Sequence, residues 1–346
     1  MMRILILSDG KPGHFKKSEA VAKAIQLCRP AEVEWLDITL RWHGFHSILK
    51  RWFNWKGSLP SPKWLPWFYN MPGSPQMRPD LIVSSGGKTC IANAWLASCM
   101  HCPNVFIGDT RGLSPDLFDH ILTLDTSNQG DPRYVIGIPP TTIDPQELRE
   151  AAEDYFDERP QADRDVRYWS LLLGGNTNCG AFVYSRRDWE QLADAVAELA
   201  ERHGIRWLIT TSRRTGRTAE SVFRHKRLQP YIEDLYLYGK DDRKIFNAFL
   251  ACSDAVFCTE DSGTMLTESV ASARPVFSIR PRQSRLSRPL ENMLNFYVQQ
   301  RRIKRLNIAD VHTVSIEDVT TGFNPGSRRD LHALGSRLLE GLQRAA

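Results

Sequence analysis

The sequence lacks any apolar stretch close to the roughly 18 residues that a membrane-spanning helix needs. It also lacks a signal-peptide pattern, because Met1-Met2-Arg3 leads directly into the apolar run Ile4–Leu7. Cysteine is sparse, and its seven residues, an odd number spread over 346 positions, do not suit a disulfide framework. We therefore expect a cytoplasmic protein whose only membrane contact would be at the inner face of the membrane.

Several ligand-binding motifs are incomplete or missing. Ser84–Thr89 ends like a Walker A loop, but the first glycine of that motif would have to stand at position 82, which is Ile82. No Gly-x-Gly-x-x-Gly follows the first strand of either half, which argues against a dinucleotide cofactor. Cys99 and Cys102 form a single C-x-x-C without a second pair, so a zinc site is not expected. The sequence predicts neither a cofactor nor a metal ion.

What the chain does contain is a repeated alternation of short apolar strands and amphipathic helices, split by a charged, polar segment at about 144–165. At 346 residues, two domains of roughly 150 residues each are the expectation. The predicted strands are 3–7, 33–37, 80–85, 104–108 and 120–124, then 167–173, 206–211, 235–238, 255–258 and 275–279. The predicted helices include 18–27, 147–160, 186–203 and 242–252.

This alternation predicts an α/β fold of two doubly wound, Rossmann-like domains that face a cleft. The first domain covers 1–150 and carries an insertion near 41–78, and the second covers 165–326. The last segment, 327–346, is predicted to be a helix that crosses back to the first domain. Ligand-binding loops are expected at the carboxyl ends of the parallel strands.

The most informative segment is Thr259–Phe277, which reads as a strand end, a turn, a helix and the next strand. Ser262, Gly263 and Thr264 open the helix, where free N–H groups and the helix dipole suit a diphosphate. Glu268 follows about 6 Å further along the helix axis, a distance that suits a carboxylate bound to the hydroxyls of the ribose. The alternative is that Ser262 only caps the helix and Glu268 is a solvated surface residue.

Further turns with glycine or basic residues follow other predicted strands. In the second domain these are Gly174-Gly175-Asn176 and the loop with Arg213 and Arg214, which could place a guanidinium on a phosphate. In the first domain they are Gly13, at the end of the loop 8–14, and Gly86-Gly87, both expected on the acceptor side. Tight turns use glycine for purely structural reasons, and a basic loop can simply be solvated, so both alternatives stay open.

Two residues are candidates for the general base. His14 lies in a glycine-containing loop after the first strand, and an imidazole can accept a proton near neutral pH. Asp109 follows another strand and is the rival candidate, although an Asp at the start of a turn is commonly only an Asx-cap.

The segment between Asp37 and Asp80 contains no acidic residue, while tryptophans and cations alternate along it. Such a composition suits an anionic membrane surface, with rings at the headgroup level and charges on phosphates. Nucleic acid could use the same chemistry, but no recognised nucleic-acid module accompanies the segment, so no nucleic-acid partner is predicted. The aromatic residues could instead pack the insertion. They are Trp42, Trp52, Phe53, Trp55, Trp64, Trp67 and Phe68, among Arg41, Lys50, Arg51, Lys56 and Lys63.

Four motifs together resemble the "elongated mitochondria" mitochondrial-fission family, whose bacterial members are regarded as GT-B glycosyltransferases. They are the segments 8–14, 171–176, 210–215 and 260–268. A more distant similarity is to the glycosyltransferase that adds N-acetylglucosamine to the lipid-linked peptidoglycan precursor. That enzyme has matching elements at Gly13-His14, Gly174-Gly175, Ser262-Gly263-Thr264 and Glu268, and the resemblance implies a GT-B fold and a ribose-binding Glu268. Lys11-Pro12 departs from its pattern, which has small residues there.

The resulting hypothesis is a metal-independent glycosyltransferase of the hexosyltransferase kind. A nucleotide sugar, expected to be a UDP-sugar, would bind the second domain, and a lipid-linked or envelope glycan would accept the sugar on the first. Helix N-termini and Arg213 or Arg214 would stabilise the departing diphosphate in place of Mg²⁺, and His14 or Asp109 would deprotonate the acceptor hydroxyl. The alternatives are a sugar-nucleotide epimerase of the same fold and a non-catalytic, membrane-associated adaptor.

Overall fold

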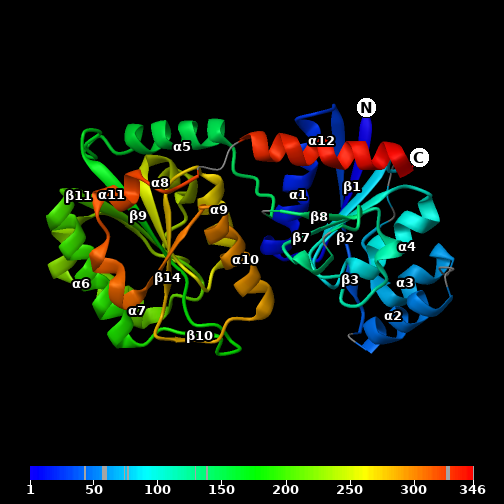
Figure 1. Ribbon diagram of the computed structural model, residues 1–346, viewed down its shortest axis with the longest axis horizontal. Helices are drawn as coiled ribbons and strands as arrows, with labels where there is room; N and C mark the ends of the chain where they lie inside the picture. The colour runs from blue at the N-terminus through cyan, green and yellow to red at the C-terminus, as the bar shows by residue number, and fades with distance from the viewer. Residues whose placement is uncertain are drawn as a thin grey trace. The chain divides into compact units, whose positions relative to one another are not determined.

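The computed structural model describes residues 1–42, 44–56, 61–73, 75, 78–128, 130–137, 139–324 and 328–345. It divides into two compact units (Figure 1). Unit 1 consists of Met1–Thr142 and Arg329–Ala346, and unit 2 consists of Ile143–Arg328. The predicted start of the last helix at Ser327 and the predicted end of the second domain at 325–326 lie outside the described residues.

Unit 1 is built on a six-stranded parallel sheet. In spatial order its strands are β2 (Ala31–Asp37), β1 (Met2–Ser8), β5 (Leu81–Ser85), β6 (Asn104–Ile107), β7 (His120–Thr123) and β8 (Tyr134–Ile136). Its helices are α1 (Pro12–Gln26), α2 (Gly44–Lys56), α3 (Leu65–Phe68), α4 (Cys90–Met100) and α12 (Arg328–Ala345), with 3-10 turns η1 (Pro62–Trp64), η2 (Pro115–Leu117) and η3 (Thr126–Asn128). A small antiparallel pair joins β3 (Thr39–Leu40) to β4 (Tyr69–Asn70).

Unit 2 repeats the plan with a second six-stranded parallel sheet. Its spatial order is β12 (Ile232–Tyr236), β11 (Ile205–Thr211), β9 (Arg167–Leu173), β13 (Ser253–Thr259), β14 (Val276–Arg280) and β16 (Lys304–Asn307). The helices are α5 (Pro145–Asp157), α6 (Arg186–His203), α7 (Gly216–Phe223), α8 (Phe246–Cys252), α9 (Gly263–Ala271), α10 (Arg288–Gln299) and α11 (Ile316–Thr320). Two 3-10 turns, η4 (Lys226–Tyr231) and η5 (Ile308–Thr313), and a small antiparallel pair of β10 (Phe182–Val183) and β15 (Gln283–Ser284) complete the unit. The prediction of two doubly wound domains is confirmed.

Buried aromatic side chains hold the sheet of unit 2 to its helices. Trp169, Trp207 and Phe257 are all 0% exposed, and the rings of Trp169 and Phe257 stack with centroids 5.5 Å apart. Each such side chain contributes roughly 1.5–3 kcal/mol by its burial, which makes this cluster a major source of the stability of unit 2.

The helix α6 begins and ends as the sequence predicts. Ser185 accepts a hydrogen bond from the Asp188 N–H, and the Asp188 carboxylate accepts one from the Ser185 N–H, which completes a capping box. Gly204 ends the helix with φ of 61°, a left-handed conformation that glycine adopts without strain.

The last helix, α12, packs on the sheet of unit 1 beside α1 (Figure 1). Leu338 is 0% exposed and lies in one apolar cluster with Ile4 of β1 and Val21 of α1. Gly335 faces α1 so closely that an added Cβ would collide with the carbonyl oxygen of Ala24. The chain therefore completes unit 1 with its final residues.

The helix α5 belongs to unit 2, although composition placed the end of the first domain within it. The Tyr155 ring packs edge-on against Phe249 of α8, with centroids 6.0 Å apart. After the helix, Arg159 forms an ion pair of 3.0 Å with the buried Asp234 of β12. These contacts attach the segment to the second sheet.

The predicted helix 242–252 is wrong in its first turn, because α8 begins only at Phe246. The Asp241 carboxylate accepts a hydrogen bond from the Arg243 backbone N–H and also pairs with the Arg243 guanidinium. This turn takes the place of the first helical hydrogen bonds.

Within the described ranges, no helix combines the length and the hydropathy that crossing a membrane requires.

The aromatic residues of the insertion divide into two groups. Phe53 is 2% exposed and packs edge-on against Trp95 of α4, so part of the insertion is ordinary core. Trp52 and Phe68 are partly buried against the same core. Four other rings are largely open to solvent: the exposed fractions of Trp42, Trp55, Trp64 and Trp67 are 61%, 80%, 52% and 71%. Packing thus accounts for some of the aromatic residues, but not for these tryptophans.

Candidate functional site

Both sheets have a topological switch point, where the strand order reverses and ligands of doubly wound proteins bind. In unit 1 this point lies between β1 and β5, and in unit 2 it lies between β9 and β13. The loops that follow these strands carry most of the residues singled out from the sequence. The topology brings them together in two clusters, one in each unit.

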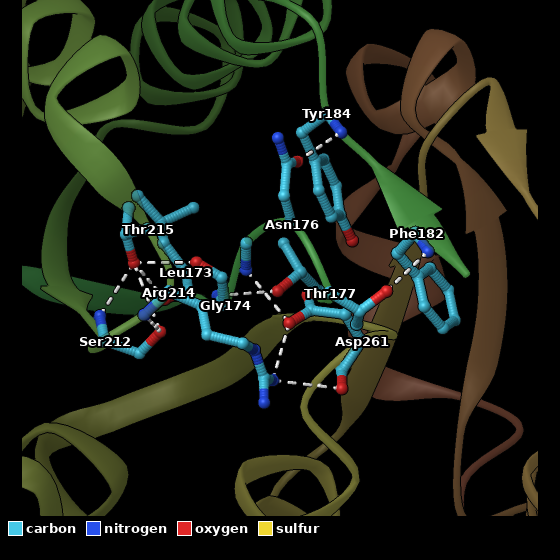
Figure 2. A network of polar contacts seen from close by, with 12 residues as sticks. Leu173, Gly174, Asn176, Thr177, Phe182, Tyr184, Ser212, Arg214, Thr215 and Asp261 are labelled. Carbon is cyan, nitrogen blue, oxygen red and sulfur yellow. Dashed lines mark hydrogen bonds and ion pairs between the residues drawn. The ribbon is translucent and has the colours of Figure 1, made fainter. Parts of the chain in front are cut away.

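In unit 2 the Gly174-Gly175 turn is fastened to the end of β13 (Figure 2). The Gly174 N–H donates to Thr259 Oγ1 at 2.7 Å, and the Gly175 N–H donates to Asp261 Oδ2 at 2.9 Å. A Cβ at Gly174 would collide with the Asp261 carboxylate. The two glycines therefore allow close packing of the loops, and their N–H groups are already used within the protein.

Arg214 belongs to the same network. Its guanidinium donates to Asp261 Oδ2 at 2.7 Å and to the Asp261 carbonyl at 3.0 Å. The Asp261 side chain is fully buried, and this burial raises the pKa of its carboxyl group. The N–H of Gly175 and the guanidinium of Arg214 act in the opposite direction, because both stabilise the charged carboxylate.

The neighbouring Arg213 is exposed, and among the described residues its guanidinium has no hydrogen-bond or ion-pair partner. The two arginines of the predicted loop thus differ: Arg214 holds the loop to Asp261, whereas Arg213 is available to a ligand. Asn176 is also exposed, and its Oδ1 accepts a hydrogen bond of 2.7 Å from the Tyr184 N–H. Its amide nitrogen is left for solvent or a ligand.

The start of α9 has the features of an anion-binding helix N-terminus. Ser262 is the N-cap residue but its side chain makes no capping hydrogen bond. Within the described part of the chain, no acceptor is bound to the N–H groups of Gly263, Thr264 or Met265. A Cβ at Gly263 would meet only the Met293 side chain, at 3.5 Å, so space is open around this turn. Free N–H groups and the helix dipole suit a phosphate.

Glu268 is only 6% exposed, so the alternative of a solvated surface residue is wrong. Its charge is among those that, after burial, raise the pKa of the Cys258 thiol, which places its carboxylate close to β13. A role in binding ribose stays a prediction.

Glu260, which the sequence did not single out, has a structural role next to this site. It is 0% exposed, and its carboxylate pairs in a bidentate manner with Arg305 of β16, at 2.7 and 2.9 Å. Ser278 donates a third hydrogen bond to it at 3.1 Å. A buried carboxylate with this many donors ties β13 to β14 and β16.

In unit 1, His14 lies in the first turn of α1 and not in a loop, because the helix begins at Pro12. Proline is well suited to the first helical position, since it needs no N–H acceptor there and its φ is already helical. Gly13 is consequently part of the helix. The predicted loop is therefore shorter than the sequence indicated.

The Nδ1 atom of His14 lies 2.9 Å from the Oδ2 atom of Asp9, whose side chain is 0% exposed. The ring is 32% exposed and lies over Gly86, where an added Cβ would collide with Nδ1. A buried carboxylate that fixes Nδ1 leaves Nε2 open to solvent or a ligand. Asp9 was missed from the sequence, although its position directly after a parallel strand was a signal.

Asp109 is exposed, and its Oδ1 accepts a hydrogen bond of 2.8 Å from the Arg111 N–H. This is the Asx-turn that the sequence allowed as the alternative. It does not prevent Asp109 from contacting a ligand.

No group of three or more His, Cys, Asp or Glu side chains in the described segments is arranged to hold a metal ion.

Comparison with known proteins agrees with the fold. Residues 12–313 match the model of the family described as "Mitochondrial fission ELM1". The chain belongs to this family. None of the curated proteins compared with it matches.

Solved structures of the GT-B fold resemble the protein over its whole length. The UDP-GlcNAc 2-epimerase of Methanocaldococcus jannaschii has a TM-score of 0.62 and 14% identity, with 99% of this chain and 100% of that chain covered. The S. aureus MnaA–UDP co-structure has a TM-score of 0.59 and 14% identity, with 100% of this chain and 97% of that chain covered. The Neisseria meningitidis UDP-GlcNAc 2-epimerase bound to UDP-GlcNAc has a TM-score of 0.59 and 13% identity, with 99% of this chain and 100% of that chain covered. At these identities the likeness establishes the fold alone.

Proposed function

We propose that this member of the Mitochondrial fission ELM1 family is a glycosyltransferase that takes its sugar from a nucleotide-sugar donor, expected to be a UDP-sugar. The observation that carries the proposal is the unpartnered N-terminus of α9 at the switch point of the second sheet, among the residues described. The GT-B neighbours named for UDP or UDP-GlcNAc support the choice of these compounds as the first ligands to test.

The donor binds unit 2. The N–H groups of Gly263 and Thr264 hold the diphosphate, with Arg213 as the adjacent cation and Asn176 as an additional hydrogen-bond donor. Glu268 accepts hydrogen bonds from the ribose hydroxyls. Arg214, Gly174 and Gly175 act indirectly, because they shape the loop through Asp261 and do not face a ligand with free donors.

The chemistry requires a base, and His14 is the better candidate because Asp9 orients its ring. His14 Nε2 accepts the proton of an acceptor hydroxyl, whose oxygen then forms a bond to the anomeric carbon of the sugar. The bond from that carbon to the diphosphate oxygen breaks, and its electron pair leaves with the nucleoside diphosphate. The α9 N-terminus and Arg213 stabilise this developing charge, which is the role a Mg²⁺ ion has in other transferases.

The acceptor is proposed to be a lipid-linked or envelope glycan at the inner face of the membrane. The support for this comes from the exposed tryptophans of the insertion and from the six Lys and Arg residues between Asp37 and Asp80, a stretch without a single Asp or Glu. Rings at the headgroup level and cations on lipid phosphates would hold unit 1 to an anionic bilayer.

The direct test is to measure the binding of UDP and UDP-GlcNAc to the protein, by calorimetric titration and by the shift in thermal unfolding. A ligand present at 100 times its dissociation constant should raise the free energy of unfolding by about 2.7 kcal/mol. Arg213→Ala and Glu268→Gln should weaken binding about tenfold each, by loss of one charge-assisted contact. Arg217→Ala, which removes an exposed charge of the same unit, is the matched control.

Failure of every nucleotide and nucleotide sugar to bind would contradict the proposal. The epimerase alternative has its own signature: incubation of UDP-GlcNAc with the protein alone would change the stereochemistry of the sugar, as seen by NMR, without any acceptor. A transferase leaves the donor sugar unchanged until an acceptor is added.

A further inference from the structure

The Gly86-Gly87 turn after β5 is surrounded by cationic side chains from two other segments. The Arg111 side chain, from the loop after β6, lies so close to Gly87 that an added Cβ would collide with Nε. Lys50 of α2 reaches the same loop, and its Nζ lies 3.5 Å from the position of a Cβ at Gly112. His46, one helical turn before Lys50, lies close enough for both charges to act on its ring. Arg111 and His46 therefore lie at the Gly87 turn, and Lys50 lies beside the loop that carries Arg111.

Arg111 and Lys50 are not ion-paired within the described part of the chain. Among the described residues, neither the Arg111 guanidinium nor the Lys50 ammonium group has a carboxylate partner. The nearby Asp109 is bound to the Arg111 backbone N–H, in an Asx-turn that holds Arg111 at φ of 55°. This left-handed conformation costs roughly 1 kcal/mol, and the turn that maintains it carries the guanidinium over Gly87.

His46 adds a buried atom without a partner. Its Nε2 is shielded from solvent and makes no hydrogen bond to any described residue. Burial, followed by the charges of Arg111 and Lys50, lowers the pKa of the imidazole, while a hydrogen bond with the Gly87 backbone acts in the opposite direction. When this nitrogen carries a proton it can donate to an anion, and the anion also offsets the charges of the two cations.

The arrangement is also held in place before any ligand arrives. Asn54 of α2 donates from Nδ2 to the Gly112 carbonyl at 2.8 Å and accepts from the Ser114 N–H at 3.0 Å. These two bonds fix the helix that carries His46 and Lys50 to the loop that carries Arg111. A preorganised set of donors loses less entropy on binding than flexible surface cations do.

We propose that Arg111, Lys50 and His46, around the Gly86-Gly87 turn, form a binding site for a phosphate or diphosphate group of the acceptor. The site belongs to unit 1, and it lies beside the base, because the His14 ring covers Gly86. An acceptor held here by its phosphate would present a nearby hydroxyl to His14. The assignment of the anion to the acceptor rests on the proposed transferase function, whereas the binding of the anion does not.

The probe is inorganic pyrophosphate, titrated into the whole protein by calorimetry. Arg111→Ala and Lys50→Ala should each weaken its binding about tenfold or more, because each removes a charge-assisted hydrogen bond. Arg51→Ala is the matched control, since this exposed cation is the immediate neighbour of Lys50 in α2, and it should leave the affinity unchanged. Arg111→Lys should restore part of the affinity and guards against a loss caused by misfolding.

Two results would overturn the inference. One is the absence of pyrophosphate binding to the unaltered protein. The other is an affinity that Arg111→Ala does not change but Arg213→Ala reduces, because pyrophosphate would then occupy the α9 site. The titration of the same variants with UDP-GlcNAc separates this inference from the proposed function. If Arg111→Ala loses pyrophosphate binding but keeps UDP-GlcNAc binding, the result supports both the anion site and the proposed function. If the unaltered protein binds pyrophosphate through Arg111 but binds no nucleotide sugar, only the anion site is supported.

Discussion

The guanidinium of Arg214 lies 2.7 Å from the buried Oδ2 of Asp261, and this pair connects the loop after β11 to the end of β13. Arg213, the preceding residue, is exposed. Two adjacent arginines that look equivalent in the sequence therefore have separate tasks, one in the architecture of the loop and one in contact with solvent or ligand.

Replacement of the two arginines should separate these tasks. Arg214→Ala leaves a buried carboxylate without its cation and should lower the free energy of unfolding by about 2 kcal/mol, less than for a fully buried pair because Arg214 is about one-third exposed. Arg213→Ala should leave the stability unchanged and weaken nucleotide binding. Urea unfolding and calorimetry on both variants measure the two effects. Equal stability of the two variants would contradict the structural role of Arg214.

Gly335→Ala tests the close approach of α12 to α1. Alanine favours helix over glycine by about 1 kcal/mol, so propensity alone predicts a more stable protein. The Cβ would instead collide with the Ala24 carbonyl oxygen, a backbone atom that cannot move without displacing α1. We expect the free energy of unfolding of unit 1 to fall by about 2 kcal/mol, as measured by chemical denaturation. Gly341→Ala is the comparison, because its Cβ would meet the His120 side chain and not a backbone atom, and should cost less.

His120 should make unit 1 less stable in acid. Burial lowers the pKa of its imidazole below 6.5, against an opposing effect of Asp119, while Arg337 acts in the same direction as burial. The unfolded chain then binds more protons than the folded protein just below pH 6.5, so stability falls as the pH decreases through this window. The difference in unfolding free energy between pH 7.5 and 5.5 should be smaller in the His120→Asn variant than in the unaltered protein. An unchanged difference would show that other groups, such as His46, cause the acid sensitivity.

The exposed tryptophans should bind the protein to anionic vesicles. Trp64 and Trp67 have ring centroids 6.4 Å apart. Lys63 directly precedes Trp64, and Arg41 directly follows β3, which pairs with β4 just after Trp67. Sedimentation with vesicles of phosphatidylglycerol and phosphatidylcholine should retain the unaltered protein, and salt should weaken the binding. Trp64→Ala with Trp67→Ala should reduce retention about tenfold or more, given the apolar area of two indole rings.

The control for the vesicle experiment is Trp35→Ala, which removes a 44% exposed tryptophan from β2, outside the insertion. Retention that depends equally on Trp35 would argue against a specific surface on the insertion. Binding to single-stranded nucleic acid in place of vesicles would assign the same rings to base stacking.

Strand and helix positions could be predicted because periodicity reports burial directly. The apolar runs at β1, β9 and β13 are buried on both faces, and the capping signal at Ser185 is local. The edge strand β16 was not predicted, since Lys304 and Arg305 give it a polar sequence. Its place in the sheet depends on the pairing of Arg305 with the distant Glu260, which no local pattern reveals.

The same limit applies to the candidate site. The sequence indicated loops that the structure places at the switch points of the two sheets, because glycine and polar residues after parallel strands mark ligand-binding edges. It could not divide their residues into those that face inward and those that face a ligand. Gly174 and Gly175 look like a phosphate loop, yet their N–H groups are bound by Thr259 and Asp261, which follow about 85 positions later in the chain.

The position of α12 has a consequence for synthesis of the chain on the ribosome. Unit 2 is continuous in sequence, so it can fold as soon as α11 has emerged. Unit 1 begins first but ends last: the apolar surface that includes Ile4 and Val21 stays uncovered until Leu338 has been translated. During that interval the nascent protein exposes a surface that chaperones or aggregation could reach, and a premature stop before α12 would make the exposure permanent.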